Sequence, residues 1–254
     1  MNDLYGEAFQ YLEKSFRILE GMVSPPQKEW HEGTYYFRYA EKTIHQAMVQ
    51  KLARVISGLH AASMLVNYGF LQEQAALHRM LDEFHEDTLF LAYAVINDNV
   101  TETHRRYLAA FYKEEFDHLT GEWSPGRKKM MVQRREIRAY LDEAQQNNMD
   151  PKNRVALSNQ IYASYSGFVH GASPHIMDMV QGSPPKFQLQ GLKGTALHKL
   201  HQDDLFNPCF RAIISFALVA KAFGNEELFQ SLRVYHLEFD KKSGRNNAYH
   251  PESN

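Results

Sequence analysis

The sequence contains few of the residues that cross-link or interrupt a chain. Cys209 is the single cysteine among 254 residues, which excludes a disulfide framework and a zinc site built from thiolates, and suits a reducing cytoplasm. The 9 prolines and 14 glycines leave long stretches in which helices run without a break. No window approaches the roughly 18 apolar residues of a membrane span, and the N-terminal residues do not form a secretory signal. We therefore expect a soluble cytoplasmic protein with no membrane segment.

The chain also lacks an excess of charge of either sign. Its 28 Lys and Arg residues stand against 30 Asp and Glu residues, which gives a formal net charge of -2. This balance disfavours a strongly basic protein that binds nucleic acid non-specifically. A local basic segment begins at Arg127, and within it Arg134 and Arg138 share a helical face. That face is either a solvated helix surface or a strip that contacts the phosphates of RNA or of a nucleotide.

Apolar residues at helical spacing dominate the rest of the sequence. They recur every three or four positions through residues 35–68 and 70–96, and the end of the second run is apolar all round, which is typical of a central helix. Further helices are expected over residues 103–119, 127–146, 152–169, 210–223 and 226–239, with a short one after Ser173. The pattern predicts an all-α fold, an antiparallel multi-helix bundle in a single domain over residues 1–240. Residues 241–254 are polar and are expected to form a disordered tail.

One segment interrupts the helical pattern. Residues 181–205 are rich in glycine and proline, and their only strand-like alternation is Phe187–Gln190. We expect a long irregular loop here that closes one end of the bundle. A loop of this length inside a domain is either functional or mobile.

The most suggestive polar group gathers at the expected end of the 152–169 helix. Tyr162, Ser166 and His170 fall on one helical face, Tyr165 lies beside them, and Ser173 follows a few residues later. An imidazole beside hydroxyl groups acts as a general acid or base near neutral pH. Alternatively, these side chains only satisfy backbone groups at a helix end. The functional interpretation places His170 and Tyr165 in catalysis and the other three residues in substrate binding.

Arg79 and Glu83 form the second candidate. They lie one turn apart on the 70–96 helix with apolar residues on both sides. Such a pair is either an exposed ion pair, worth about 0.3–0.5 kcal/mol, or a desolvated pair that faces a cleft.

Metal-ligand spacings are incomplete. Glu115 and His118 form an E-x-x-H element, but the nearest second element, Asp82 with His85, has Asp in place of Glu. A di-iron bundle needs two E-x-x-H elements and two further glutamates. The other histidine pairs with ligand-like spacing are His198 with His201 and His170 with His175. We therefore assign no metal and no other cofactor.

Two of these motifs together resemble a family of uncharacterised bacterial helical proteins, over roughly residues 45–225. The motifs are the Arg79-x-x-x-Glu83 helix and the Tyr165–Ser173 segment with its VHG sequence. Those proteins are similar in character to the HEPN superfamily of all-α bundles, many of which are toxin or defence ribonucleases that act without a metal. The resemblance implies cleavage of RNA through its 2′-hydroxyl. It also implies that His170 is the acid or base, that Arg79 steadies the phosphate and that Glu83 orients Arg79.

The sequence departs from the ribonuclease signature of HEPN proteins, R-x(4–6)-H on one helix. No arginine lies four to seven residues before His170. The pairs that fit the spacing are Arg38 with His45, Arg54 with His60, Arg79 with His85, and Arg245 with His250. So many scattered matches identify no site. Besides a metal-independent protein that cleaves RNA or processes nucleotides, two other functions stay open. They are a non-catalytic helical binding or scaffold protein, and a metal-dependent helical-bundle enzyme. The expected partners are RNA or a nucleotide, and pairing of two copies as a homodimer also stays open.

Overall fold

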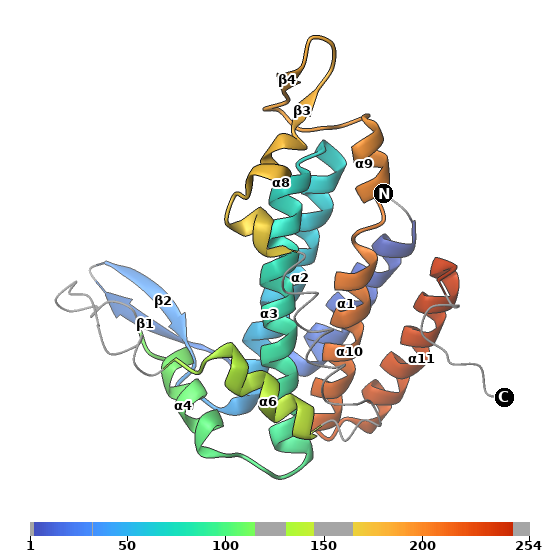
Figure 1. Ribbon diagram of the computed structural model, residues 1–254. Coiled ribbons are helices and arrows are strands. Elements are labelled where there is room, and N and C mark those ends of the chain that lie inside the picture. The colour runs from blue at the N-terminus through green and yellow to red at the C-terminus, as the bar shows by residue number, and fades with distance from the viewer. Residues whose placement is uncertain (1–2, 32, 115–130, 145–164, 246–254) are drawn as a thin grey trace.

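The computed structural model describes residues 3–31, 33–114, 131–144 and 165–245 (Figure 1). Within these ranges nine helices have both ends described, and the strands form only two two-stranded sheets, which confirms the all-α class. The helices are α1 (Asp3–Glu20), α2 (Ile44–Tyr68), α3 (Leu71–Ile96), α4 (Glu102–Phe111), α6 (Arg134–Ala144), α8 (Ser173–Met177), α9 (Ala196–His201), α10 (Phe206–Ala222) and α11 (Glu226–Ser243). The strands are β1 (Gln27–His31), β2 (Thr34–Arg38), β3 (Val180–Gln181) and β4 (Lys186–Phe187).

Helices α2 and α3 pack along each other at the centre of the bundle and are joined by a short turn (Figure 1). Helix α2 begins with a capping box, in which the Thr43 hydroxyl accepts from the Gln46 amide at 3.1 Å while the Gln46 side chain accepts from the Thr43 amide at 3.0 Å. It ends at Gly69, which has a φ of 81°. A Cβ at Gly69 would lie 2.2 Å from the backbone nitrogen of Lys193, so only glycine fits at this turn.

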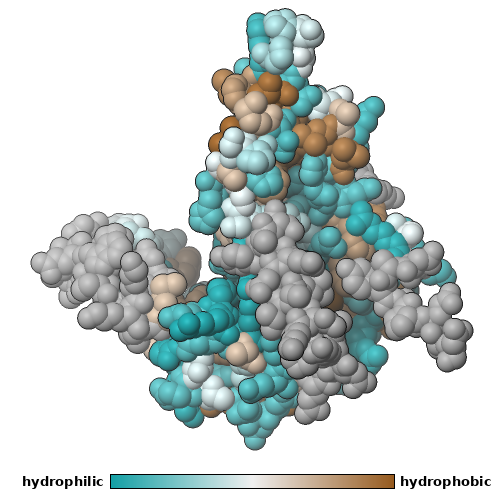
Figure 2. Space-filling view, in the orientation of Figure 1, coloured by the Kyte–Doolittle hydropathy of each residue, from teal (hydrophilic) through white to brown (hydrophobic). Residues whose placement is uncertain are grey.

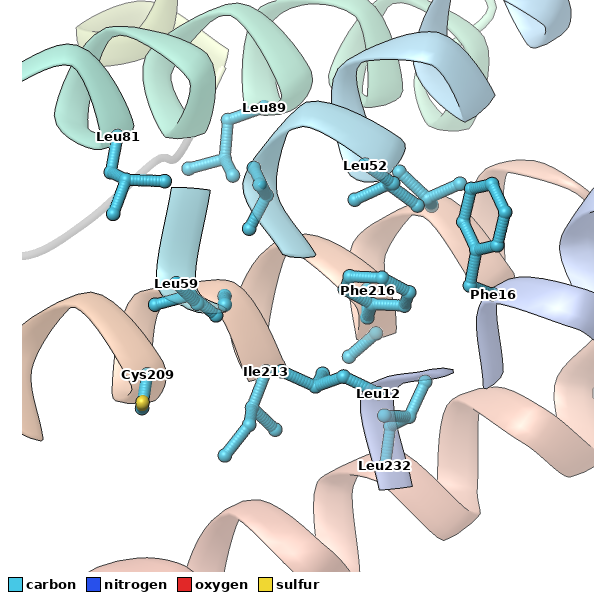
Figure 3. Packing of buried hydrophobic residues seen from close by; sticks show 14 of the residues in the cluster. Leu12, Phe16, Leu52, Leu59, Leu81, Leu89, Cys209, Ile213, Phe216 and Leu232 are labelled. Carbon is cyan, nitrogen blue, oxygen red and sulfur yellow. The ribbon is translucent and has the colours of Figure 1, made fainter. Parts of the chain in front are cut away.

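The apolar faces of α1, α2, α3, α10 and α11 meet in one core (Figure 3). Its members labelled in Figure 3 are Leu12, Phe16, Leu52, Leu59, Leu81, Leu89, Cys209, Ile213, Phe216 and Leu232. The apolar end of α3 is buried over residues 89–92, as expected of a central helix. Cys209 has no exposed surface, and burial raises the pKa of its thiol well above the ordinary value.

Two expected helices differ from the structure within the described residues. Helix α4 ends at Phe111, and the hydroxyl of Tyr112, the residue after it, donates to the Thr43 carbonyl at 2.7 Å. Helix α6 covers residues 134–144, and residues 131–133 of the expected 127–146 helix are not helical. The other parts of the expected 103–119 and 127–146 helices, residues 115–119, 127–130 and 145–146, lie outside the described residues. A helical stretch at residues 165–169 matches the end of the expected 152–169 helix, whose earlier part lies outside the described residues.

The expected loop at residues 181–205 is irregular only in part. It takes part in the β3–β4 hairpin and contains α9, whose N-terminal cap is Thr195 with its hydroxyl 3.1 Å from the His198 amide. The segment lies at the end of the bundle where α2 turns into α3 (Figure 1), and the Leu192 amide donates to the Gly69 carbonyl at 2.8 Å. At the other boundary, α11 continues to Ser243, past residue 240, and residues 246–254 of the expected tail lie outside the described chain.

The expected helical run over residues 35–68 is wrong at its start, because residues 35–38 lie in β2 and α2 begins only at Ile44. Two elements at the start of the chain were not predicted as such. One is α1, which packs on α2, α10 and α11. The other is the antiparallel β1–β2 hairpin, called the arm below, which projects from the side of the bundle (Figure 1). Its strands read QKEWH and TYYFR, and neither has the apolar alternation of a half-buried strand.

Apolar surface is unevenly distributed. One helical stretch in the described chain, Ala196–Ala222, has the length and apolar character of a membrane span, but 67% of its 18-residue apolar window is buried in the bundle, as in a core helix. Figure 2 shows brown apolar side chains near the end of the bundle that carries α8 and the β3–β4 hairpin. The exposed apolar residues of this end include Val169, Ile176, Met177, Phe187, Leu189 and Leu200.

Candidate functional site

Helix α3 carries an unusual number of polar side chains into the interior. It packs against α2, α10 and α6, so no face along its length is left wholly to solvent. Its buried polar residues are Gln74, His78, Arg79, Asp82, Asp87 and Thr88. Buried charges are costly unless they are paired, which makes their partners the key to this helix. They fall into two groups, an upper cluster around Asp82 and a lower cluster around Asp87.

Asp82 is the centre of the upper cluster. One carboxylate oxygen accepts a hydrogen bond from the Arg211 guanidinium of α10, and the other is buried without a hydrogen-bond partner. Burial raises the pKa of Asp82 from 3.8 to about 6, against the opposing effect of the positive charges on Arg211 and Arg79. The carboxyl group therefore changes its protonation state close to neutral pH, as a general acid or base must.

His78 lies one turn before Asp82 on the same helix and is 1% exposed. Its Nδ1 has no hydrogen-bond partner, and burial lowers the pKa of the imidazole to about 4. The ring is consequently neutral at pH 7. The ring of Tyr165 meets it edge-on, with centroids 5.7 Å apart and planes at 87°. Burial and the charge of Asp82 raise the pKa of Tyr165 to about 12.

Arg79 and Glu83, which the sequence singles out, form the ion pair that their spacing predicts. The Arg79 guanidinium lies 2.7 Å from Glu83 Oε1. The Arg79 side chain is only 9% exposed, whereas that of Glu83 is 39% exposed. The pair is thus buried at its cationic end and open at its anionic end. The Arg79 charge also reaches Asp82, whose pKa it lowers.

The segment around His170 lies beside this cluster through Tyr165. Its helical stretch ends at Gly171, which has a φ of 62°, and the Ala172 amide donates to the Gly167 carbonyl at 2.9 Å. His170 is exposed at this helix end, and Ser173 is exposed at the start of α8. Tyr165 therefore contacts α3, whereas His170, five residues later in the chain, is exposed at the surface. Ser166 is half-buried, and Tyr162 lies outside the described residues.

Arg134 and Arg138 belong to the lower cluster. Arg134 binds Asp87 Oδ1 at 2.6 Å, Arg138 binds Glu86 at 2.8 Å, and Lys51 of α2 binds the other oxygen of Asp87 at 2.7 Å. Burial favours the neutral acid, but the Lys51 and Arg134 charges outweigh it and hold the pKa of Asp87 below its usual range. The two arginines predicted to contact phosphates thus bind carboxylates of α3 and dock α6 on that helix.

Two cavities adjoin these helices. A cavity of about 120 Å³ lies against the lower cluster and is lined by Lys51, Asp87, Tyr107 and Arg134 together with apolar side chains. A second, of about 320 Å³, lies between α1, α2 and the residues that link α9 to α10, with Ser63 among its lining residues. Of the predicted site residues that the structure describes, only Arg134 lines either cavity.

Three of the histidines considered as metal ligands make other contacts. His198 Nε2 lies 2.6 Å from the Val66 carbonyl, and its Nδ1 accepts from the Gly194 amide at 3.2 Å. His201 binds Asp204 at 2.5 Å, and His85 binds Ser215 at 2.7 Å. Across the described ranges, no group of three or more His, Cys, Asp or Glu side chains is placed to hold a metal ion. Glu115 and His118 lie outside those ranges.

No protein-family model, curated protein or solved structure matches this chain. The function must therefore be argued from the residues themselves.

The sequence analysis did not predict three members of the upper cluster as site residues: His78, Asp82 and Arg211. A signal for each was present. His78 and Asp82 are one turn apart on a helix that ends in an almost wholly apolar run, and Arg211 is the only charged residue between Phe210 and Ala220. A lone charge in a buried helix needs a buried counter-charge, so Arg211 and Asp82 were natural partners.

Proposed function

We propose that the chain is a metal-independent protein of HEPN-like character that cleaves RNA or processes nucleotides, and that the upper cluster is its site. One observation supports this proposal above the others. The helix end that carries Tyr165 and His170 lies against the part of α3 that carries Arg79, Glu83 and Asp82, through the contact of Tyr165 with His78. The two motifs that resemble the ribonuclease-like family therefore adjoin in space although they lie far apart in the sequence.

The groups of the cluster match the needs of RNA cleavage by its own 2′-hydroxyl. The 2′-oxygen attacks the adjacent phosphorus, the bond to the 5′-oxygen breaks, and a 2′,3′-cyclic phosphate and a 5′-hydroxyl result. A base takes the 2′-hydroxyl proton, and an acid gives a proton to the leaving 5′-oxygen. We assign one of these two proton transfers to Asp82 and the other to His170. Arg79, oriented by Glu83, stabilises the charge that develops on the phosphate oxygens.

The remaining residues take supporting roles in this proposal. Arg211 keeps Asp82 in place and adds a second positive charge beside the phosphate. The Ser166 and Ser173 hydroxyls contact the substrate at the helix end, and Tyr165 packs between that end and α3. The single buried cysteine and the buried apolar helix fit a protein of the cytoplasm, where RNA is abundant.

The test is RNA integrity in cells that express the wild-type chain, His170→Ala or His60→Ala. His60 is a matched control because it is an exposed histidine on α2, paired with Glu13. We expect cleavage by the wild type and by His60→Ala, persistence of cleavage in lysates treated with a chelator, and a loss of about a hundredfold or more in His170→Ala. Intact RNA in all three, or cleavage that chelation abolishes, would contradict the proposal.

A second function has one observation in its favour. His78 and Asp82 are 1% and 9% exposed, so the cluster is closed in this structure. A closed polar cluster fits a non-catalytic helical protein that binds a small molecule or a partner. Intact RNA in the experiment above, together with a rise in melting temperature when ribonucleotides are added, would favour this binding function.

A further inference from the structure

The proposed cleavage leaves the arm without a role. Strand register pairs Trp30 with Tyr35 and Lys28 with Phe37, so these four side chains project from one face of the hairpin. Trp30, Tyr35 and Phe37 are 70%, 41% and 54% exposed. Such a group of exposed rings is unusual for a monomer and marks a binding surface.

The rings form a continuous band. The centroids of Trp30 and Tyr35 lie 5.2 Å apart, and those of Tyr35 and Phe37 lie 5.5 Å apart. Lys28 Nζ lies 4.3 Å from the centre of the Tyr35 ring, so a positive charge sits among the rings. Neither strand contains an aliphatic residue, and the only carboxylate of the two strands, Glu29, belongs to the opposite face.

Among the described residues, the band takes no part in the core of the bundle. The arm is a two-stranded sheet whose strands, within the described ranges, pair only with each other, and it projects from the bundle (Figure 1). At its base, Arg38 is tied to Glu114, which follows α4, at 2.5 Å. A lone hairpin is only marginally stable in water, and cross-strand ring contacts stabilise it by only about 0.2–1 kcal/mol each, which leaves most of the exposed ring surface unused by the fold. The rings are exposed to solvent and are available to bind a partner.

We propose that this face is a platform on which unpaired bases of single-stranded RNA stack. The inference rests on the proposed function and names its substrate class. Aromatic rings bind bases of any kind through their flat faces, and a lysine among them meets the phosphate backbone. Paired bases in a duplex have both faces covered, so the platform selects single strands.

The charge on the face favours RNA over a second copy of the chain. In a two-fold contact between two such faces, the Lys28 ammonium groups would be brought together with no carboxylate on either face to separate them. A polyanion has the opposite charge and suffers no such repulsion.

Binding is measured by the fluorescence anisotropy of a fluorescein-labelled ten-nucleotide oligouridylate. The full chain is used with His170→Ala throughout, so that the probe is not cut. We expect the double change Trp30→Ala with Phe37→Ala to weaken binding about tenfold or more, because two stacking rings are lost. Tyr68→Ala is the matched control, since Tyr68 is an exposed ring on α2 with Lys193 above it, and it should bind as the parent does. A duplex of the same length should bind more weakly and should not respond to the double change.

A second readout follows the arm itself. The chain has 2 tryptophans, so Trp123→Phe leaves Trp30 as the only one. Stacking of bases on Trp30 should quench its fluorescence as oligouridylate is added. Far-ultraviolet circular dichroism of each variant should match the parent, because the arm contains no helix.

The outcomes separate this inference from the proposed cleavage. Equal affinity for oligouridylate in the parent and the double variant would overturn the platform even if the wild type cleaves RNA. A concentration-dependent dimer that the double variant abolishes, with unchanged RNA affinity, would assign the face to a second copy and also overturn it. If binding depends on the arm but the wild type leaves RNA intact, the result would support the platform and contradict the proposed cleavage.

Discussion

The upper and lower clusters of α3 are built from the same kinds of group and differ in how completely each carboxylate is paired. Asp87 binds Arg134 through one oxygen and Lys51 through the other, whereas Asp82 binds Arg211 through one oxygen and leaves the second without a hydrogen bond. The pKa of Asp87 is lowered and that of Asp82 is raised to about 6. Both side chains are buried, so burial alone does not set the ionisation. The number of cations that contact the carboxylate decides its ionisation. A fully paired carboxylate holds helices together, whereas a partly paired one is able to exchange a proton.

Removal of the charge on Asp87 should have the largest effect. Asp87→Asn leaves the Lys51 ammonium and the Arg134 guanidinium near each other without their shared carboxylate, and α2, α3 and α6 all meet there. We expect a loss of about 3 kcal/mol in the free energy of unfolding at pH 7, measured by urea denaturation. A loss below about 1 kcal/mol would show that the lower cluster is not a structural tie.

Asp82→Asn should act with the opposite sign. The folded-state pKa of about 6 lies above the ordinary 3.8, so the folded chain holds this proton more tightly than the unfolded chain. Ionisation of Asp82 therefore costs stability, and the cost grows as the pH rises from about 4 to about 6, reaching at most about 3 kcal/mol. The asparagine carries no such cost.

We accordingly expect Asp82→Asn to match the wild type in stability near pH 3.5 and to exceed it by about 1–3 kcal/mol at pH 7. Urea denaturation over a series of pH values measures the difference. For Asp87 the linkage runs the other way. Its stabilising contribution is present above the ordinary pKa and is lost as the pH falls through the lowered one. If both asparagine variants were less stable than the wild type at pH 7, the contrast between the clusters would be lost.

Glu83→Gln should have the smallest effect on stability and a clear one on activity. Because the Glu83 side chain is 39% exposed, its ion pair with Arg79 is screened by water, and we expect a change within about 0.5 kcal/mol. Loss of the group that orients Arg79 should lower RNA cleavage about tenfold. Glu102→Gln, which removes an exposed pair with Arg105 on α4, is the matched control and should change neither quantity. Equal cleavage by the two variants would separate Glu83 from the proposed site.

The sequence predicted the parts of the fold that depend on local periodicity. The apolar spacing anticipated α2, α3, α10 and α11, and Gly69 marked the turn at which α2 ends. The arm could not be found in this way, because its rings face solvent and leave no alternation of buried and exposed residues. The expected helix over residues 103–119 is interrupted at residues 112–114, where Tyr112 and Glu114 contact residues that precede α2, and no local pattern encodes these contacts.

The same limit applies to the candidate site. The pairing of Arg79 with Glu83 follows from helical spacing, so the sequence predicted it. The pairing of Arg211 with Asp82, and that of Arg134 with Asp87, depends on which helices pack on α3. Two basic residues on one helical face therefore predicted either a solvated surface or a phosphate strip, although their counter-charges lie on α3. His170 remains a sequence prediction that the RNA experiment tests.

The burial of Cys209 makes the chain its own reporter of unfolding. Only the thiolate reacts with alkylating or disulfide reagents, and this thiol is both shielded and kept protonated in the folded state. Because no second cysteine competes, the labelling rate measures how often α10 separates from the core. The labelling rate of Cys209 therefore reports on unfolding in each α3 variant. Moreover, a cysteine introduced at an exposed position could be tagged with a fluorophore without replacing the native one.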